Sequence, residues 1–171
     1  SMKIFFLYFL IILSVLSLQT SYADRIVSSQ QLVEDLYGDL VVISMKELST
    51  DEQETKLKNL FEKYVDIPII ARAVLGKSWR EANSDQRKRF IDAFKGYVSN
   101  KYGRQFSEFK GTTLEIVKSR DTLTKAGVLV STEVVVPGNP PLKVVWQISD
   151  GSGALKLVDL RVEGISMLST E

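Results

Sequence analysis

The sequence contains neither cysteine nor histidine in its 171 residues. Without cysteine there can be no disulfide framework, so a domain of this size must be held together by its apolar core. No cysteine is present to carry a lipid anchor either. The two absences together exclude Ser-His-Asp and Cys-His nucleophile systems, and zinc sites with histidine or cysteine ligands. An enzyme would have to depend on carboxylates, tyrosine or lysine.

Neither sign of charge is in excess, because 22 lysine and arginine residues face 21 aspartate and glutamate residues. A nucleic-acid-binding domain normally carries a strong basic excess on one face or helix. The balance here argues against that class of protein. We expect no nucleic acid partner, no metal and no cofactor.

The only long apolar run lies at the N-terminus. Lys3 precedes an apolar stretch over residues 4–18, which is short for a membrane span. Ser21 and Ala23 are small residues at the two positions that a signal peptidase inspects. The pattern predicts a cleavable signal peptide within residues 1–23, with cleavage after Ala23. A retained membrane anchor is the alternative interpretation.

Residues 24–171 are expected to form one exported, soluble domain, and their 148 residues suffice for a proper core. Loss of the leader would remove Lys3 and leave 21 basic against 21 acidic residues, a net charge of zero. Ser1 stands before Met2 and is interpreted as a cloning remnant.

The first half of this domain shows helical spacing. A stripe of Leu32, Leu36, Leu40 and Ile43 predicts a helix that Ser28 or Ser29 can cap. Three more helices are expected. They begin at Thr50 with Gln53 as a capping box, at Asp66, and at Asn83 or Ser84.

Proline and glycine mark the bounds of the later helices. Pro68 lies in a first turn, where a missing N–H costs little, and Gly76 can end that helix with a positive φ. Gly103 is expected to bend or interrupt the longest helix before Phe109.

From Thr112 onward the apolar period changes to two, which predicts strands. Turns are expected at residues 137–141 and 150–153. In the last strand the apolar phase shifts between Leu157 and Val158, which indicates a bulge or twist. The predicted fold is α+β, with the helical half packed on one face of a twisted four-stranded antiparallel sheet. An apolar cleft is expected between the two layers.

The stretch from Tyr64 to Tyr97 resembles the core of the toluene-tolerance or MlaC family of periplasmic phospholipid-binding proteins. The residues 162–167 (Val-Glu-Gly-Ile-Ser-Met) also resemble that family's closing strand. The matching positions are Ile70-Ala71, Val74-Leu75-Gly76, Trp79-Arg80, Ala82, Gln86, Arg89-Phe90 and Phe94.

The resemblance implies a soluble periplasmic carrier that binds phospholipid acyl chains in an apolar cleft, with the head group near the mouth. It further implies that the carrier moves lipid between the outer and inner membranes and so maintains outer-membrane lipid asymmetry. An inner-membrane ABC transporter complex and an outer-membrane lipoprotein complex are the implied partners. A carrier has no catalytic residues, so no enzyme activity is expected.

Apolar residues of the helices and of the sheet are candidates for the wall of this cleft. An apolar stripe alone is more typical of a filled core, and it is the resemblance that favours a lipid site. The candidates are Ile70, Val74, Leu75, Phe90, Phe94, Tyr97, Tyr102, Leu129, Val144, Trp146 and Ile148.

Two polar groups are candidates for contacts with a head group or a partner. Trp79 and Arg80 follow Gly76 closely and could form a lip that touches lipid or a partner. Alternatively, Trp79 could brace the loop onto the core while Arg80 pairs with Glu81 or Asp85. The basic run Arg87, Lys88 and Arg89 could face an anionic head group, although such runs are usually solvated.

Asp159, Arg161 and Glu163 alternate on one strand, which would place the two carboxylates roughly 13 Å apart. Paired glycosidase carboxyls lie about 5–9.5 Å apart. An ion-pair ladder is therefore favoured over a catalytic pair.

Three other functions remain as alternatives. One is a carrier of another apolar ligand of the hopanoid type, and one is a protein-interaction adaptor with a filled core and an exposed apolar patch. The last is an enzyme based on carboxylates or tyrosine.

Overall fold

The computed structural model describes residues 2–170, and the side chains of residues 4, 8, 23–105 and 107–170. The helices are α1 (Met2–Ser44), α2 (Thr50–Tyr64), α3 (Ile67–Leu75), α4 (Lys77–Glu81) and α5 (Ser84–Gly103), followed by the short 3₁₀ helix η1 (Phe106–Phe109). The strands are β1 (Thr113–Asp121), β2 (Val128–Val135), β3 (Leu142–Ser149), β4 (Lys156–Val162) and β5 (Ile165–Ser166), and the 3₁₀ helix η2 (Leu168–Thr170) follows. Ser1 lies outside the described residues.

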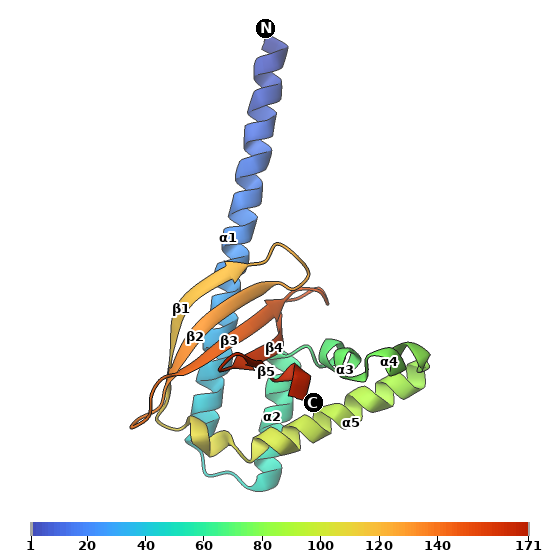
Figure 1. Ribbon diagram of the computed structural model, residues 1–171, viewed down its shortest axis with the longest axis vertical. Helices are drawn as coiled ribbons and strands as arrows, with labels where there is room; N and C mark the ends of the chain where they lie inside the picture. Colours follow the sequence, from blue (N-terminus) through green and yellow to red (C-terminus); the bar gives the residue numbers. More distant parts are fainter. Residues whose placement is uncertain (1, 171) are drawn as a thin grey trace.

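The strands form one antiparallel sheet in the order β1-β2-β3-β4-β5, and α1 packs against β1 and β2 (Figure 1). The predicted α+β fold is confirmed, with five strands in place of four. The extra strand, β5, pairs with β4 through two residues only. Glu163 and Gly164 form the turn between them with φ values of 50° and 82°. A strand this short shows no period in the sequence.

Helix α1 begins inside the predicted leader and continues without a break to Ser44. Its N-terminal half projects away from the rest of the protein (Figure 1). The predicted cap is wrong, because Ser29 lies inside the helix and its hydroxyl donates to the Arg25 carbonyl at 2.7 Å. The predicted stripe is confirmed, since Leu36 and Ile43 are buried in the core. None of the helices, over the residues that were described, is long and apolar enough to cross a membrane.

The helix caps lie close to their predicted positions. Helix α2 begins at Thr50, and its capping box lies one residue before the predicted one. Ser49 accepts from the Glu52 amide while the Glu52 carboxylate accepts from the Ser49 amide. A Glu side chain reaches back in this way to satisfy an amide that the helix leaves unpaired. Asp66 caps α3 by accepting from the Ile69 amide at 3.1 Å. Gly76 ends α3 with a φ of 55°.

Helix α5 has a capping box at its start. The Asn83 side chain accepts from the Gln86 amide, and the Gln86 side chain accepts from the Asn83 amide. The helix ends at Gly103, and η1 follows, as the sequence predicted. Helices α3, α4 and α5 lie beside the sheet and form an arm, residues 67–103 (Figure 1).

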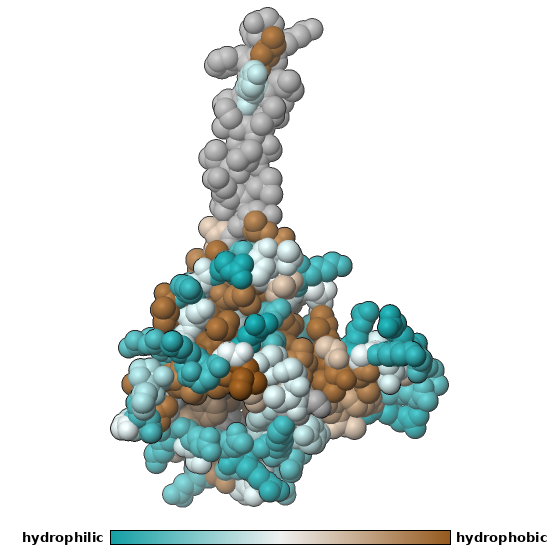
Figure 2. Space-filling view, viewed as in Figure 1, coloured by the Kyte–Doolittle hydropathy of each residue, from teal (hydrophilic) through white to brown (hydrophobic). Residues whose placement is uncertain are grey.

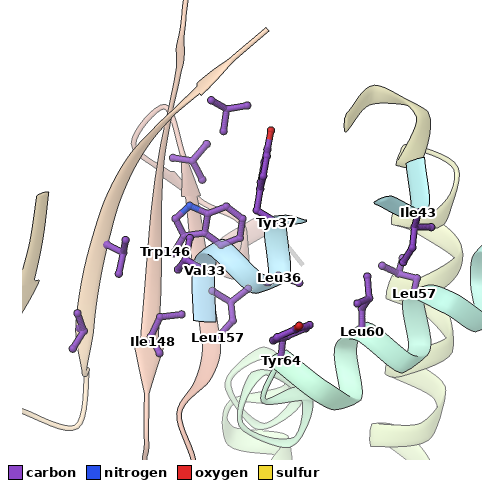
Figure 3. Close-up of a cluster of buried hydrophobic side chains, with 14 residues drawn as sticks. Val33, Leu36, Tyr37, Ile43, Leu57, Leu60, Tyr64, Trp146, Ile148 and Leu157 are labelled. Atoms are coloured by element: carbon purple, nitrogen blue, oxygen red, sulfur yellow. The ribbon is translucent and has the colours of Figure 1, made fainter. Parts of the chain in front are cut away.

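The described apolar core falls into two clusters. In the first, Trp146 and Ile148 of the sheet point toward Val33 and Leu36 of α1 (Figure 3). The second lies in the arm and consists of Ile67, Ala71, Phe94 and Val98. The two clusters share partly buried neighbours such as Phe61 of α2. The arm therefore has a core cluster of its own. It meets the rest of the domain, which we call the body (α1, α2 and the sheet), where these shared neighbours lie.

A β-bulge interrupts β4, as the shift of apolar phase predicted. Gln147 pairs with Asp159 and Ile148 with Leu157, so Val158 has no partner in the register. As a result Leu157, Val158 and Asp159 are all buried, although neighbouring residues of a regular strand face opposite sides of the sheet.

Candidate functional site: an apolar cavity between arm and body

A cavity of about 230 Å³ lies where the arm meets the body. Helices α1 and α2 contribute Leu36, Leu40, Leu57 and Leu60 to its wall. The arm contributes Ile67, Ile70, Phe94, Val98 and Tyr102. Figure 2 shows apolar residues gathered between the arm and the rest of the domain.

The third wall of the cavity comes from the end of the chain. The β4 bulge turns Leu157 and Val158 toward the cavity, and Met167 and Leu168 close it after β5. Helices α1, α2, α3 and α5, strand β4 and the C-terminal segment therefore line one cavity, although they are distant in the sequence.

The wall is almost entirely aliphatic and aromatic, and Tyr102, Gln105 and Asp159 are its only polar side chains. A buried water needs two to four polar partners, and an apolar cavity can stay dry and bind an apolar molecule. The chemistry of this wall thus suits hydrocarbon. It offers no cluster of acidic ligands, and the described residues hold no group that could bind a metal ion.

Helix α5 lines the cavity with one stripe. Phe94, Val98 and Tyr102 follow each other at a spacing of four residues, which places them on one side of the helix. Ile70, Phe94 and Tyr102 are the predicted wall residues that the structure brings to the cavity.

The other predicted residues of the arm lie nearby but do not line the cavity. Val74 and Phe90 are half-buried against the arm's own core, and Phe90 stacks on Phe94 with ring centroids 5.8 Å apart. Leu75 is half-buried near the end of α3. Tyr97 is 53% exposed, because it directly precedes the cavity residue Val98 and neighbouring residues of a helix point about 100° apart.

The predicted sheet residues lie elsewhere, which corrects the expected wall. Val144, Trp146 and Ile148 are fully packed in the first core cluster, where the Trp146 indole donates to the Thr132 hydroxyl at 2.9 Å. Leu129 lies between these positions in register, on the opposite face of β2. Strand β4, not β3, borders the cavity. In the sequence, the signal for this strand was the shift of its apolar alternation between Leu157 and Val158, where the bulge lies.

Trp79 and its neighbours lie outside the cavity wall. The Arg87 guanidinium donates to the Trp79 carbonyl at 2.9 Å and stacks 5.0 Å from its ring, which ties α4 to α5. This geometry supports a bracing role for Trp79. Arg80, Lys88 and Arg89 are exposed, and Glu81, a predicted partner of Arg80, pairs with Lys77 at 3.7 Å.

Asp159 holds the last segment of the chain against β4. Its carboxylate accepts from the Leu160 amide at 2.8 Å, the Ser166 hydroxyl at 2.7 Å and the Leu168 amide at 3.1 Å. Arg161 lies 4.0 Å away, as an ion-pair ladder requires. Glu163 does not join this ladder, because it lies in the turn after β4 and accepts from the Lys143 amide at 2.7 Å. The arrangement fastens the C-terminal segment and pairs no two carboxylates.

Two buried tyrosines have pKa values above the ordinary value for tyrosine. Burial raises the pKa of Tyr37, and its hydrogen bond with Thr112 opposes that rise. Burial also raises the pKa of Tyr64, whose hydroxyl donates to Asp39 at 2.5 Å. Neither tyrosine is part of the cavity wall. Both stay neutral at ordinary pH and act as hydrogen-bonding core residues.

Fold and site together define an α+β domain in which an antiparallel sheet and a helical arm enclose an apolar cavity. The family model described as MlaC protein matches residues 30–171. The chain therefore belongs to the MlaC family, which confirms the resemblance seen in the sequence.

Two known proteins place the chain among its relatives. It is 21% identical over 143 residues to the intermembrane phospholipid transport system binding protein MlaC of Haemophilus influenzae, covering 81% of this chain and 67% of the relative. It also shares its fold with a phospholipid-binding protein from Ralstonia solanacearum whose structure was solved in complex with a phospholipid. The TM-score is 0.68 at 17% identity, over 83% of this chain and 82% of the other.

Proposed function

We propose that the protein is a phospholipid carrier that holds acyl chains in the cavity between arm and body. The observation that carries the proposal is the cavity wall, which is almost entirely apolar and is built by helices α1, α2, α3 and α5, strand β4 and the C-terminal segment. Each methylene group taken out of water is worth about 0.8 kcal/mol, so a phospholipid does not cross an aqueous compartment unaided. A protein that encloses its chains removes this cost.

The wider role follows from the family. The protein would work in the periplasm after cleavage near Ala23, and would move phospholipid between the outer and inner membranes. It would exchange lipid with an inner-membrane ABC transporter complex and an outer-membrane lipoprotein complex, and perform no catalysis itself. N-terminal sequencing of the exported protein tests the cleavage, and a chain that still begins at Met2 would contradict it.

Lipid loading requires the cavity to widen. Ligand pockets commonly measure about 300–1,000 Å³ for drug-sized molecules, and 230 Å³ is below that range. The arm has a core cluster of its own, which shares Phe61, Val65 and Tyr102 with the first cluster. We propose that the arm moves away from β4 when lipid enters. The loaded state would therefore differ from this one in the distance between α5 and β4.

Lipid extraction tests the central proposal. Protein purified without detergent would be dissociated in organic solvent, and its lipids identified and counted by mass spectrometry. We expect about one glycerophospholipid per chain. Recovery of a terpenoid of the hopanoid type would change the ligand, and recovery of no lipid would favour an adaptor.

A further inference from the structure

We propose that a polar recess next to the cavity binds the phosphate group of the carried lipid through Arg72 and Lys125. This inference rests on the proposed function, because it concerns the polar end of the same ligand. It names the lipid class as glycerophospholipid with a negatively charged phosphate, and it gives the head group a site on the protein.

The recess has a volume of about 410 Å³ and lies between α3 and the nearby end of the sheet. Ile69 and Arg72 come from α3, and Lys125 comes from the turn between β1 and β2. Gln147 and Gly151 contribute from β3 and the turn after it. Gly151 lies so close to α3 that an added Cβ would lie 3.7 Å from the Ile69 side chain.

The recess and the cavity share a wall. Val158, Asp159 and Leu168 border both spaces, so the β4 bulge and η2 lie between the apolar cavity and a recess of mixed lining that includes Arg72 and Lys125. The proposal places the chains of an amphiphile in the cavity and its polar end in the recess, on the two sides of this shared border.

The two cations of the recess are uncommitted. Neither Arg72 nor Lys125 has a side-chain hydrogen bond or ion pair anywhere in the part of the chain that the structure describes. Ser149 is occupied, since its hydroxyl donates to the Lys125 carbonyl at 2.9 Å and accepts from the Gly151 amide at 3.2 Å. The Gln147 amide nitrogen donates to the Ala126 carbonyl at 2.9 Å, which leaves its oxygen as an acceptor.

The acids near the recess are already paired. Asp159 accepts from three donors of β4 and the C-terminal segment, and Asp150 pairs with Arg25 at 3.8 Å. A phosphate would lie on the side of Arg72 and Lys125, away from Asp159. Guanidinium and ammonium groups both bind phosphate oxygens with charge-assisted hydrogen bonds. The Gln147 oxygen can accept from a hydroxyl or ammonium of the head group.

The recess should contribute more to the choice of lipid head group than to the overall binding affinity. Both cations are exposed, and exposed ion pairs contribute modestly because water and salt screen them. Most of the affinity would come from the acyl chains, and the recess would favour lipids that carry a phosphate over those that do not.

The test compares two lipids with identical acyl chains, phosphatidylglycerol and diacylglycerol, which differ in the phosphate head group. The double variant Arg72→Gln with Lys125→Gln is compared with the unchanged protein and with a control, Lys88→Gln with Arg89→Gln. The control removes the same charge from exposed residues of α5 that border neither space. Binding is measured by displacement of a fluorescent fatty acid at low salt.

We expect the recess variant to bind phosphatidylglycerol about tenfold more weakly, with binding of diacylglycerol unchanged. Unchanged diacylglycerol binding also shows that the variant is folded. The control should bind both lipids like the unchanged protein. Loss of phosphatidylglycerol selectivity in the control instead would move the head group to α5 and overturn the proposal.

The remaining outcomes separate the two levels of inference. If the recess variant binds both lipids normally, the recess proposal is wrong and the carrier proposal stands. If the unchanged protein binds neither lipid, the carrier proposal fails and the recess proposal with it. Titration with inorganic phosphate alone distinguishes the source of the phosphate. Tight binding that depends on Arg72 and Lys125, without selectivity between the lipids, would indicate a free-phosphate site and overturn the lipid assignment.

Discussion

Filling the cavity from α5 should stabilise the ligand-free protein and weaken lipid binding at the same time. Val98 is buried, lines the cavity and lies between Phe94 and Tyr102 on the same side of the helix. Val98→Phe would direct an aromatic ring into the empty space. A change at a filled core position would not produce these opposite effects, so the pair of measurements tests the cavity itself.

The magnitudes follow from the size of the cavity. At about 24 cal/mol per Å³, an empty volume of 230 Å³ corresponds to at most about 5.5 kcal/mol of lost packing. Val98→Phe adds about four carbon atoms, worth up to about 3 kcal/mol when buried, and imperfect fit takes back about 1–3 kcal/mol. We expect a net gain near 1 kcal/mol, which raises the melting temperature by about 2–4 °C.

The effect on the ligand has the opposite sign. The ring takes the space of about four methylene groups, and their return to water costs the lipid about 3 kcal/mol, or about 100-fold in affinity. Differential scanning calorimetry of delipidated protein and fluorescent lipid displacement measure the two effects.

A control adds the same atoms outside the cavity. Val42 is 53% exposed on α1, so Val42→Phe should leave lipid affinity unchanged. If Val98→Phe lowered the melting temperature while lipid affinity stayed the same, the cavity would not be the lipid site. The reasoning from the cavity wall would then be refuted.

Other predictions concern the elements that surround the cavity. Because the pKa of Tyr37 is raised above 10.0, its contribution to stability is complete below pH 10 and is lost as pH rises above that value; urea unfolding should show a smaller loss at high pH in Tyr37→Phe, and an identical loss would contradict this. At neutral pH Tyr37→Phe should lower the free energy of unfolding by about 0.5–1.5 kcal/mol, because it removes the hydrogen bond with Thr112. Asp159→Ala removes three accepted hydrogen bonds, so amide hydrogen exchange in η2 should become faster. An exchange rate equal to that of the unchanged protein would contradict the role of Asp159 in holding the C-terminal segment. Gly127→Ala should destabilise the protein by more than about 1–3 kcal/mol, because its Cβ would lie 2.0 Å from a carbonyl of β3. Gly138 also has a positive φ but lies in open space, so Gly138→Ala should destabilise the protein less in thermal unfolding. Equal losses would show that backbone strain alone matters and that the close approach at Gly127 does not.

Local signals in the sequence predicted the bounds of the arm. Asp66 and Asn83 cap their helices and Gly76 ends α3, because a side-chain acceptor and a residue free to adopt positive φ act within one turn of the chain. The capping box of α2 was misplaced by one residue. Both Ser49-Glu52 and Thr50-Gln53 fit the motif, and only the geometry chose between them.

The cavity wall was only partly predictable. Ile70, Phe94 and Tyr102 line it, whereas Trp146 and Ile148 fill the core against α1. All five are aliphatic or aromatic residues on the inner face of a regular element. Periodicity reports that a face is buried, but it contains no information on whether the space opposite that face is filled.

By itself, the sequence determined the class of fold, the caps of α3 and α5, the β4 bulge and the family. Each of these depends on neighbouring residues or on a motif that the chain spells out in order. Only the tertiary structure decided that β4 borders the cavity, that Met167 and Leu168 close it, and that Arg72 and Lys125 share one recess. These residues lie far apart along the chain, and their meeting depends on how the arm, the sheet and the C-terminal segment pack against one another.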